Sequence, residues 1–377
     1  MITPMNPKDL FLFEEGLTYL NCANMSPMLK SVREAGLQAM QTRASPWKLA
    51  SKEWFTGAEK LRGLAASIFQ TSNDNMALIP SASYGLAVAA KNLSPKAGKD
   101  ILILEQQFPS NYYVWENLAQ QKNLQMVMVG KSPGKTLTES LLDKICENTG
   151  IIAIPNCHWI DGSWIDLQKI SNAAKTAGAY LVLDLSQSMG ALPINIDAIR
   201  PDFAVAVGYK WMLGPYGLGY MYVSEQWQEK GEPLEYSWAT RKDSDDFTAL
   251  TLYTDAYRNG ARKFDMGEFP QLNLAPMAIA GLEQIIEWRA SFIQTEIKKL
   301  TDKIVDYKNY IKPLDDTVET VGHIVSIALD GLDVNEFKAR LKSKNVVVSF
   351  RGTSIRVSPH LYNDAGEIDS LLSCLPG

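Results

Sequence analysis

Residues 203–223 read FAVAVGYKWMLGPYGLGYMYV, and this segment outlines the central architecture of the chain. The apolar runs 203–207 and 219–223 predict two buried strands, because strands covered on both faces are short and rich in β-branched residues. A surface position is the default for a lysine, but Lys210 directly follows a buried strand and precedes an aromatic residue. Apolar surroundings lower the pKa of an amine, as a Schiff-base lysine requires. Lys210 is therefore the first candidate functional residue.

A second informative segment, YLVLDLSQSMG, spans residues 180–190. Asp184 ends its apolar run, where a lone acid is costly unless it has a partner. One alternative is a helix N-cap for the following residues, since Asp is common at that position. The functional alternative is a carboxylate that faces the protonated ring nitrogen of a ligand. Gln187, three residues further on, could reach the same ligand.

Around these segments, short apolar runs alternate with longer amphipathic ones. The short runs predict seven buried strands, at 77–79, 101–105, 125–129, 151–154, 180–184, 203–207 and 219–223. The amphipathic runs predict helices at 84–92, 110–121, 137–147 and 167–177. This alternation predicts an α/β fold, with a mostly parallel seven-stranded sheet between helices. Ligands of such sheets bind beyond the carboxyl ends of the strands, so we expect the functional residues there.

The pattern changes after about residue 265, where we expect a small α+β domain. A long helix is predicted from 273 to about 314 with a break near Arg289, and a shorter helix over 333–342. Short strands are predicted at 323–328, 346–349 and 354–357. A chain of this length exceeds what one core usually supports, so we predict a large domain over 16–264. The small domain would hold 1–15 and 265–377, although the pattern alone leaves open where the N-terminal segment packs.

The overall composition excludes several classes of protein. The 377 residues carry a net charge of −5, which argues against a nucleic-acid-binding surface. No apolar run approaches the roughly 18 residues of a membrane helix, and the start lacks the features of a signal peptide, so we expect a cytoplasmic protein. Only three histidines argue against a metal site. The scattered cysteines predict reduced, buried thiols at Cys22, Cys146, Cys157 and Cys374.

The order of these motifs resembles that of the class V aminotransferases. D-x-x-Q is followed by an aromatic residue before K-W-x-L-G-P-x-G-x-G, as in that family, which includes cysteine desulfurases, kynureninase and isopenicillin N epimerase. The resemblance implies the type I fold of pyridoxal-phosphate-dependent enzymes. It extends over nearly the whole chain, through YLNCANMSPM (19–28), SASYG (81–85), EQQFPSNYYVW (105–115), IPNCHWIDG (154–162), GARKFDMGE (260–268) and SIRVSPHLYND (354–364).

The resemblance implies pyridoxal 5′-phosphate as the cofactor and assigns roles around its ring. Lys210 would form the Schiff base and then act as general base at the substrate α-carbon. Asp184 would keep the pyridine nitrogen protonated, which makes the ring an electron sink. Gln187 and Asn156 would donate hydrogen bonds near the ring hydroxyl. Phe108 would stack on the ring face, where desulfurase-like members have His and kynureninase-like members have Phe.

The resemblance also implies a phosphate site and a substrate site. Ala82 and Ser83 would bind the phosphate at a helix N-terminus, where the dipole favours an anion. Tyr209 would donate its hydroxyl to the same phosphate, in place of the family's commoner His. Arg356 would bind the carboxylate of an amino-acid substrate through two parallel hydrogen bonds, with Arg351 as a weaker second candidate.

Three further expectations concern the substrate and the partner subunit. Asn24 and His158 are candidates for substrate contacts, although a structurally satisfied histidine is an equally good interpretation of His158. Family members usually build each site from two chains, so we expect a homodimer in which 260–268 reaches the partner's site. Glu268 stands where the family usually has Thr, and an acid there would repel the phosphate unless it turned away.

The sequence leaves the reaction open. Transamination is the leading interpretation, and a lyase or hydrolase reaction of the C–S lyase or kynureninase type is the alternative. No cysteine lies between Cys157 and Cys374, which argues against a persulfide-forming desulfurase. A catalytically silent binding protein on the same fold is a third possibility, against which the intact Lys210 and Asp184 argue. The segment GKSPGKT (130–136) has three residues between its glycines where a P-loop has four, so a nucleotide hydrolase is rejected.

Overall fold

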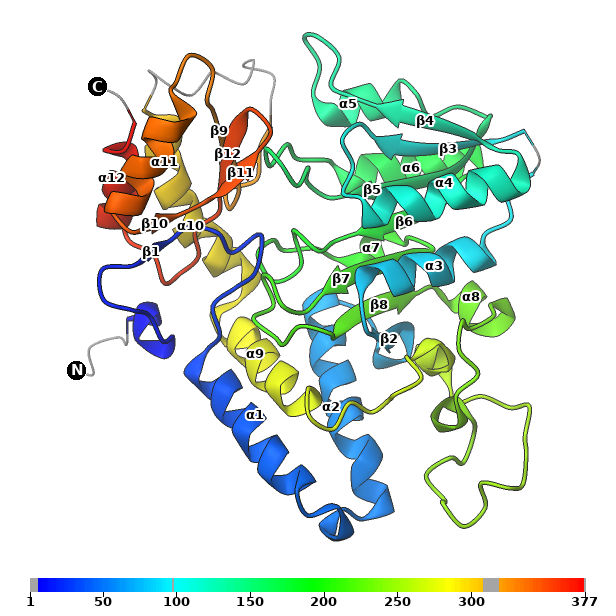
Figure 1. Cartoon of the computed structure of the whole chain (residues 1–377). Helices are drawn as coiled ribbons and strands as arrows, with labels where there is room; N and C mark the ends of the chain where they lie inside the picture. The colour runs from blue at the N-terminus through cyan, green and yellow to red at the C-terminus, as the bar shows by residue number, and fades with distance from the viewer. Residues whose placement is uncertain (1–5, 97, 308–318, 376–377) are drawn as a thin grey trace.

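A computed structural model describes residues 6–96, 98–307 and 319–375 of the chain. Its central element is a seven-stranded sheet with the strand order β2-β8-β7-β6-β5-β3-β4 (Figure 1). The strands are β2 (Met76–Ile79), β3 (Asp100–Leu104), β4 (Gln125–Val129), β5 (Thr149–Pro155), β6 (Tyr180–Asp184), β7 (Phe203–Val207) and β8 (Gly219–Val223). In this sheet, β8 runs in the direction opposite to the other six strands. All seven predicted strands and the mostly parallel sheet are confirmed.

The sheet is buried on both faces, and successive strand residues alternate between two cores. In β7, Phe203 and Val205 pack into one core, whereas Ala204 and Ala206 pack into the other. This alternation follows from the two-residue period of a strand, and it explains why both faces are apolar in the sequence. One face is covered by α3 (Ala82–Asn92) and α4 (Ser110–Lys122). The other face is covered by α2 (Ser51–Phe69), α5 (Leu137–Leu142), α6 (Leu167–Ala177) and α7 (Ile196–Ile199).

Two expectations about this region are corrected. The helix predicted over 137–147 ends five residues earlier, at Leu142, because the following residues turn before β5 begins. Cys146 lies in this turn and is exposed, whereas the other three cysteines are buried. All four cysteines are free, as expected.

Within the described residues, no helix has the length and apolar character needed to cross a membrane.

The C-terminal part of the chain forms a second, smaller sheet beside the first one (Figure 1). It contains β9 (Val325–Ala328), β11 (Ser349–Arg351) and β12 (Ser354–Val357) in the antiparallel order β11-β12-β9. The helices α11 (Val334–Ser343) and α12 (Ala365–Leu372) accompany it. The strand predicted over 346–349 is divided between β11 and the two-residue β10 (Val346–Val347), which pairs in parallel with β1 (Thr18–Tyr19).

The long helix predicted from 273 is two helices, α9 (Ala275–Trp288) and α10 (Ala290–Val305). The predicted break near Arg289 is confirmed, because that residue has a left-handed φ of 66° that a continuous helix cannot contain. The helix ends at Val305, and the predicted continuation over 308–314 lies outside the described residues.

The N-terminal segment contacts both parts of the molecule. Its strand β1 pairs with β10, whereas α1 (Lys30–Arg43) packs on α9. The domain boundaries expected from the sequence therefore stay a proposal. The remaining helical elements are short: α8 (Glu225–Lys230) and the 3-10 helices η1 (Pro7–Leu10), η2 (Pro46–Lys48), η3 (Asn73–Asn75), η4 (Trp238–Thr240) and η5 (Gly260–Phe264).

Candidate active site

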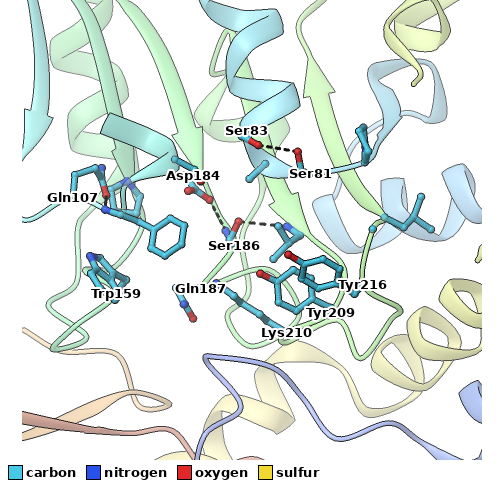
Figure 2. Close-up of a pocket in the computed structure, with 18 of the residues that line it drawn as sticks. Ser81, Ser83, Gln107, Trp159, Asp184, Ser186, Gln187, Tyr209, Lys210 and Tyr216 are labelled. Atoms are coloured by element: carbon cyan, nitrogen blue, oxygen red, sulfur yellow. Dashed lines mark hydrogen bonds between the residues drawn. The ribbon is translucent and has the colours of Figure 1, made fainter. Parts of the chain in front are cut away.

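A cavity of about 210 Å³ lies at one edge of the large sheet (Figure 2). The parallel strands end at this edge and the antiparallel β8 begins there, so loops from six neighbouring strands meet around the cavity. The lining residues follow β2, β3, β5, β6 and β7 or precede β8, and they include Ser81, Ala82, Ser83, Gln107, Phe108, Cys157, Trp159, Asp184, Ser186, Gln187, Tyr209, Lys210 and Tyr216.

Lys210 lies on a closed loop between the antiparallel strands β7 and β8. The Gly208 N–H donates to the Leu218 carbonyl at 3.0 Å, and the Gly214 N–H donates to the Gly208 carbonyl at 2.9 Å. A Cβ atom on Gly208 would lie 2.8 Å from the Leu218 oxygen, so this close approach requires glycine. These backbone bonds fix the loop and direct the lysine side chain into the cavity.

Lys210 is 7% exposed, and this burial changes its acidity. Burial lowers the pKa of its amine to about 8, and the charge of Asp184 opposes part of that shift. The positive charges of Arg356 and Arg351 lower the pKa further. The amine lies 5.4 Å from the ring centre of Phe108. A lysine in this setting holds an appreciable fraction of neutral amine near neutral pH, which is the reactive form.

Asp184 is the last residue of β6, and Gln187 lies on the turn that follows it (Figure 2). The Ser186 N–H donates to Asp184 Oδ1 at 3.0 Å and fixes the carboxylate at the strand end. Gln187 Nε2 donates to the Ala23 carbonyl at 2.9 Å, and the Trp211 indole donates to Gln187 Oε1 at 2.9 Å. The second N–H of the Gln187 amide is the group left to meet a ligand in the cavity.

The N-terminus of α3 forms the anion-binding part of the cavity. The Ser81 hydroxyl caps the helix by accepting the Tyr84 N–H, and its oxygen lies 2.9 Å from the Ser83 hydroxyl (Figure 2). The first N–H groups of a helix have no partner within the helix. The amides of Ala82 and Ser83 are therefore available to an anion, and the helix dipole favours a negative charge there.

Two pairs of aromatic residues line the cavity. Phe108 is 37% exposed and meets the Trp159 ring edge-to-face, with 5.4 Å between ring centres. The Trp159 indole donates to the Gln106 carbonyl at 2.8 Å, which fixes the ring. On the other side Tyr209 packs on Tyr216 at 4.6 Å, and burial raises the pKa of the Tyr209 hydroxyl. A flat aromatic ligand would fit against Phe108.

Arg356 lies behind Trp159, on β12 of the small sheet. It is 1% exposed and donates from Nη1 to the Trp159 carbonyl at 2.8 Å. Its Nε and Nη2 atoms are buried and have no hydrogen-bond partner among the described residues. Burial, together with the charge of Arg351, lowers the pKa of the Arg356 guanidinium to about 10. Unpaired buried donors of this kind are costly, so an anionic ligand is the partner that chemistry favours.

Five of the predicted site residues do not line the cavity: two are Arg351 and Arg356 beside Trp159, and the other three are Asn156, His158 and Asn24. Asn156 donates its amide to the Ile165 carbonyl at 2.9 Å and so anchors the chain after β5. His158 is buried, with Nε2 3.3 Å from the Glu105 carbonyl and Nδ1 3.3 Å from Asp161. Asn24 is exposed. The roles proposed for these three side chains remain predictions.

The sequence reasoning missed Ser186, Gln107, Trp159 and Tyr216, which all line the cavity. All four stand inside segments that the sequence had singled out, 105–115, 154–162, 180–190 and 203–223, so their place near the ligand could have been expected. Within these segments, the apolar pattern does not mark which side chains enter the cavity. Within the described residues, no cluster of metal-ligating side chains is present.

Comparison with known proteins agrees with this geometry. The family described as "Aminotransferase class-V" matches residues 19–371, so the chain belongs to the class V aminotransferase family. An uncharacterized aminotransferase, YcbU of Bacillus subtilis, is 24% identical over 97% of this chain and 95% of its own. A kynureninase of Bacillus cereus is 25% identical over 95% of this chain and 87% of its own.

Solved structures show the same fold. A structure of the cystine C–S lyase C-DES covers 95% of this chain and 97% of its own, with a TM-score of 0.85 and 16% identity. A second C-DES structure, in which glycine is linked to the PLP cofactor, has a TM-score of 0.86 at 16% identity and covers 98% of both chains. The predicted fold and family are confirmed, and with them an enzyme family that depends on pyridoxal phosphate. The family includes more than one type of reaction.

Proposed function

We propose that this protein is a pyridoxal-phosphate-dependent enzyme that acts on an amino acid or amine, with the cofactor held covalently by the Lys210 amine. Transamination is the leading reaction. The observation that carries the proposal is Lys210 itself, a buried amine with a pKa of about 8 that shares one cavity with Asp184 and the α3 N-terminus. Lysines are almost never buried without a partner or a chemical role.

The residues around the cavity fit the cofactor part by part. The Ala82 and Ser83 amides and the Tyr209 hydroxyl would hold the phosphate, and Phe108 would cover one ring face. Asp184 would accept a hydrogen bond from the protonated ring nitrogen. When bound, pyridoxal phosphate supplies an electron sink for negative charge at the substrate α-carbon.

Three side chains of the protein then have separate roles in the reaction. The neutral Lys210 amine takes the proton from the substrate α-carbon, and its pKa of about 8 suits a base near neutral pH. The Asp184 carboxylate, fixed by the Ser186 N–H, would hold the proton on the ring nitrogen of the bound cofactor. Arg356 binds the substrate carboxylate with its unpaired N–H groups and so orients the α-carbon toward Lys210.

A lyase or hydrolase reaction is the second candidate. Its support is the likeness to kynureninase and to C-DES, together with the Phe108 side chain that kynureninase-like members share. Persulfide chemistry by a protein thiol is disfavoured. Burial raises the pKa of Cys157 to about 12, and burial also raises the pKa of Cys22, so neither thiol near the cavity is a ready nucleophile. A catalytically silent binding protein is the third candidate.

We also propose that the protein is a cytoplasmic homodimer that binds neither nucleic acid nor membrane. Support for self-association comes from large side chains that stand in solvent on the segment before η5, among them Leu252 at 76% and Tyr253 at 94% exposure. The proposed cross-over segment 260–268 directly follows it. Sedimentation of the cofactor-bound protein tests the dimer, and a monomer that retains its cofactor would contradict it.

The cofactor role is tested by visible absorption of the purified protein, before and after borohydride reduction. We expect a band in the wild type that Lys210→Ala lacks, and a reduced adduct on the peptide that contains Lys210. Lys169→Ala is the matched control, since Lys169 is an exposed lysine of α6. A band that survives in Lys210→Ala would contradict the role of this lysine. No band after pyridoxal phosphate is added to the wild type would favour the silent binding protein.

The reaction type is tested by the products formed with and without a keto-acid acceptor. Transamination requires the acceptor, because the amino group has to leave the cofactor. Pyruvate, sulfide or alanine released without an acceptor would identify the lyase or hydrolase reaction.

A further inference from the structure

Two arginines of the small sheet lie together behind the cavity. Arg351 ends β11 opposite Ser354, and Arg356 lies two residues further along β12, opposite Ser349. Directly paired residues share a face of an antiparallel pair, as do residues two apart on one strand. Arg351 and Arg356 are therefore diagonal neighbours on one face of the small sheet.

Both guanidinium groups turn toward Trp159, which is one of the residues that line the cavity. The Arg351 guanidinium lies 5.3 Å from the Trp159 ring centre and that of Arg356 lies 6.0 Å away. Their charges reach the catalytic lysine, since both lower the pKa of Lys210. The two arginines thus lie next to Trp159, and the Trp159 ring in turn contacts Phe108 in the cavity.

Each arginine keeps unpaired donors. Arg351 donates from Nη1 to the Phe350 carbonyl at 2.9 Å, but its buried Nε has no partner. Arg356 has two such atoms, Nε and Nη2. Within the described residues, no carboxylate forms an ion pair with either arginine. Burial lowers the pKa of both guanidinium groups.

The α-carboxylate of an ordinary amino acid neutralises one of these two positive charges. The second, that of the partly buried Arg351, keeps no counter-ion among the described residues and a buried Nε donor without a partner, which is unfavourable. We propose that the substrate is an amino acid that carries a second acidic group. Its α-carboxylate binds Arg356, and its distal acid binds Arg351, so that Arg351 determines substrate specificity. This inference rests on the proposed function and extends it to a class of substrate.

The test separates recognition from chemistry by titrating the holoprotein with carboxylates that carry no amino group. Glutarate, a dianion, is compared by calorimetry with glutaramate, in which one carboxylate is replaced by a neutral amide of the same size. We expect the wild type to bind glutarate at least roughly 10-fold more tightly, as one additional charge-assisted pair implies. Succinate and adipate with their half-amides extend the comparison to other spans between the two arginines.

The variants locate the second contact. Arg351→Gln should remove the preference for the dianion while binding of the half-amide changes by less than about 2-fold. Arg351→Lys should retain part of the preference, because it keeps the charge without the planar fork. Arg340→Gln, a change of an exposed arginine on α11, is the control and should leave both affinities unchanged.

Two results would overturn the inference. A wild type that binds every dianion and its half-amide equally well has no second acid site. If Arg351→Gln weakens both ligands by the same factor, the two arginines hold one carboxylate together. The visible spectrum of the holoprotein is recorded in parallel. A missing cofactor band contradicts the proposed function, whereas a normal band without dianion preference contradicts this inference alone.

Discussion

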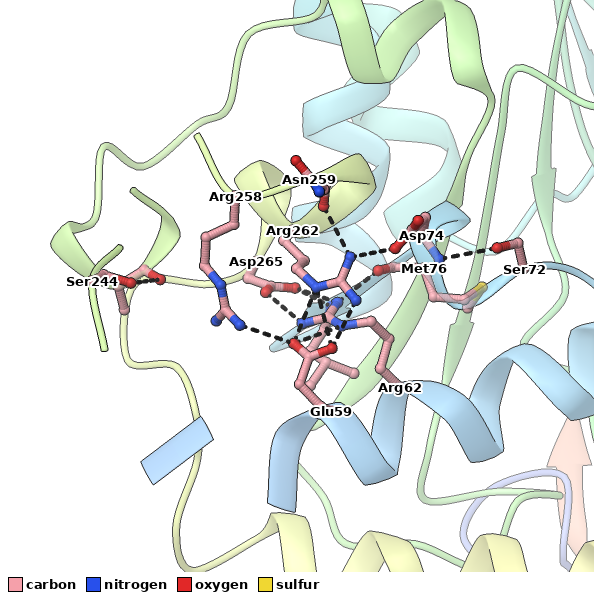
Figure 3. A network of polar contacts seen from close by, with 12 residues as sticks. Glu59, Arg62, Ser72, Asp74, Met76, Ser244, Arg258, Asn259, Arg262 and Asp265 are labelled. Carbon is pink, nitrogen blue, oxygen red and sulfur yellow. Dashed lines mark hydrogen bonds and ion pairs between the residues drawn. The ribbon is translucent and has the colours of Figure 1, made fainter. Parts of the chain in front are cut away.

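Two polar clusters of the molecule use arginines in opposite ways. In the first, which we term the arginine–carboxylate cluster, Arg62, Arg258 and Arg262 meet Glu59, Asp74 and Asp265 (Figure 3). In the second, the candidate active site, the positive charges of Lys210, Arg351 and Arg356 act on one another, and Asp184 is the one described carboxylate that acts on Lys210. The first cluster balances its charges, whereas the second has an excess of positive charge among the described residues.

The contacts show the same difference. Arg62 is completely buried, and its two terminal nitrogens donate to the Asp265 carboxylate at 3.0 and 2.7 Å, while Nη1 also donates to the Met76 carbonyl. Asp265 accepts a further bond from the Leu78 N–H at 2.7 Å, which ties the cluster to β2. Arg356 is equally buried but has two nitrogens without a partner. Paired donors stabilise the fold, and unpaired donors are left for a ligand.

The largest effect on stability is expected where the paired cluster is broken. Asp265→Asn keeps the shape but leaves the buried Arg62 charge with only its longer, 3.4 Å contact to Glu59, which should lower the free energy of unfolding by about 3–5 kcal/mol. Urea unfolding of the variant and the wild type measures the change. A loss below about 1 kcal/mol would mean that water or a neighbouring carboxylate replaces the pair.

The next largest effect on stability concerns Lys210 in the candidate active site, and it depends on pH. The pKa of Lys210 is about 8 in the folded protein and 10.5 for an ordinary lysine, so the unfolded chain binds more protons between these values. The stability of the apoprotein should therefore rise with pH from about 8 to 10.5, by roughly 3 kcal/mol. Below pH 8, Lys210 is protonated in both the folded and the unfolded chain, so its destabilising contribution no longer changes with pH.

This pH dependence is measured as the difference in unfolding free energy between wild type and Lys210→Met across that window. At pH 7 the variant should be the more stable protein, since it buries no charged amine at this position. A difference that stays constant from pH 7 to about 10.5 would show that Lys210 titrates normally in the folded chain.

The smallest effect is expected for a pair on the surface. Glu296 and Lys299 lie 2.6 Å apart on α10, with much of the Lys299 side chain in solvent. Glu296→Gln should change the free energy of unfolding by no more than about 0.5 kcal/mol, because solvent screens exposed pairs. The same urea experiment measures it. A loss as large as that of Asp265→Asn would remove the contrast between buried and exposed pairs.

Much of the fold could be predicted from the sequence because the strands of the large sheet are covered on both faces. Such strands read as continuous apolar runs, and all seven were found with only small errors at their ends. The ends of helices were less certain. The sequence predicted a helix over 137–147, but the turn around Cys146 ends it at Leu142. Nothing in the apolar pattern of that segment marks the turn.

The candidate site was predictable where residues follow a buried strand directly. Lys210, Asp184 and Phe108 come from different strands, and the sheet brings them to one edge because parallel strands end on the same side. The direction of a side chain was not predictable in this way. Asn156 also follows a strand, yet its amide is bonded to the Ile165 carbonyl, and the Gln187 amide is largely taken up by Ala23 and Trp211.

The sequence by itself determined the strand pattern, the polar residues at the strand ends and the family, because these depend on local periodicity and on short motifs. Only the tertiary structure decided which polar groups are paired. Arg62 and Asp265 are 203 residues apart, and no local signal joins them. The sequence likewise does not show that Arg351 and Arg356 share a face of the small sheet, that both contact Trp159, or that they keep donors without a partner. Pairing and burial depend on contacts between distant segments, and the folded chain alone supplies those contacts.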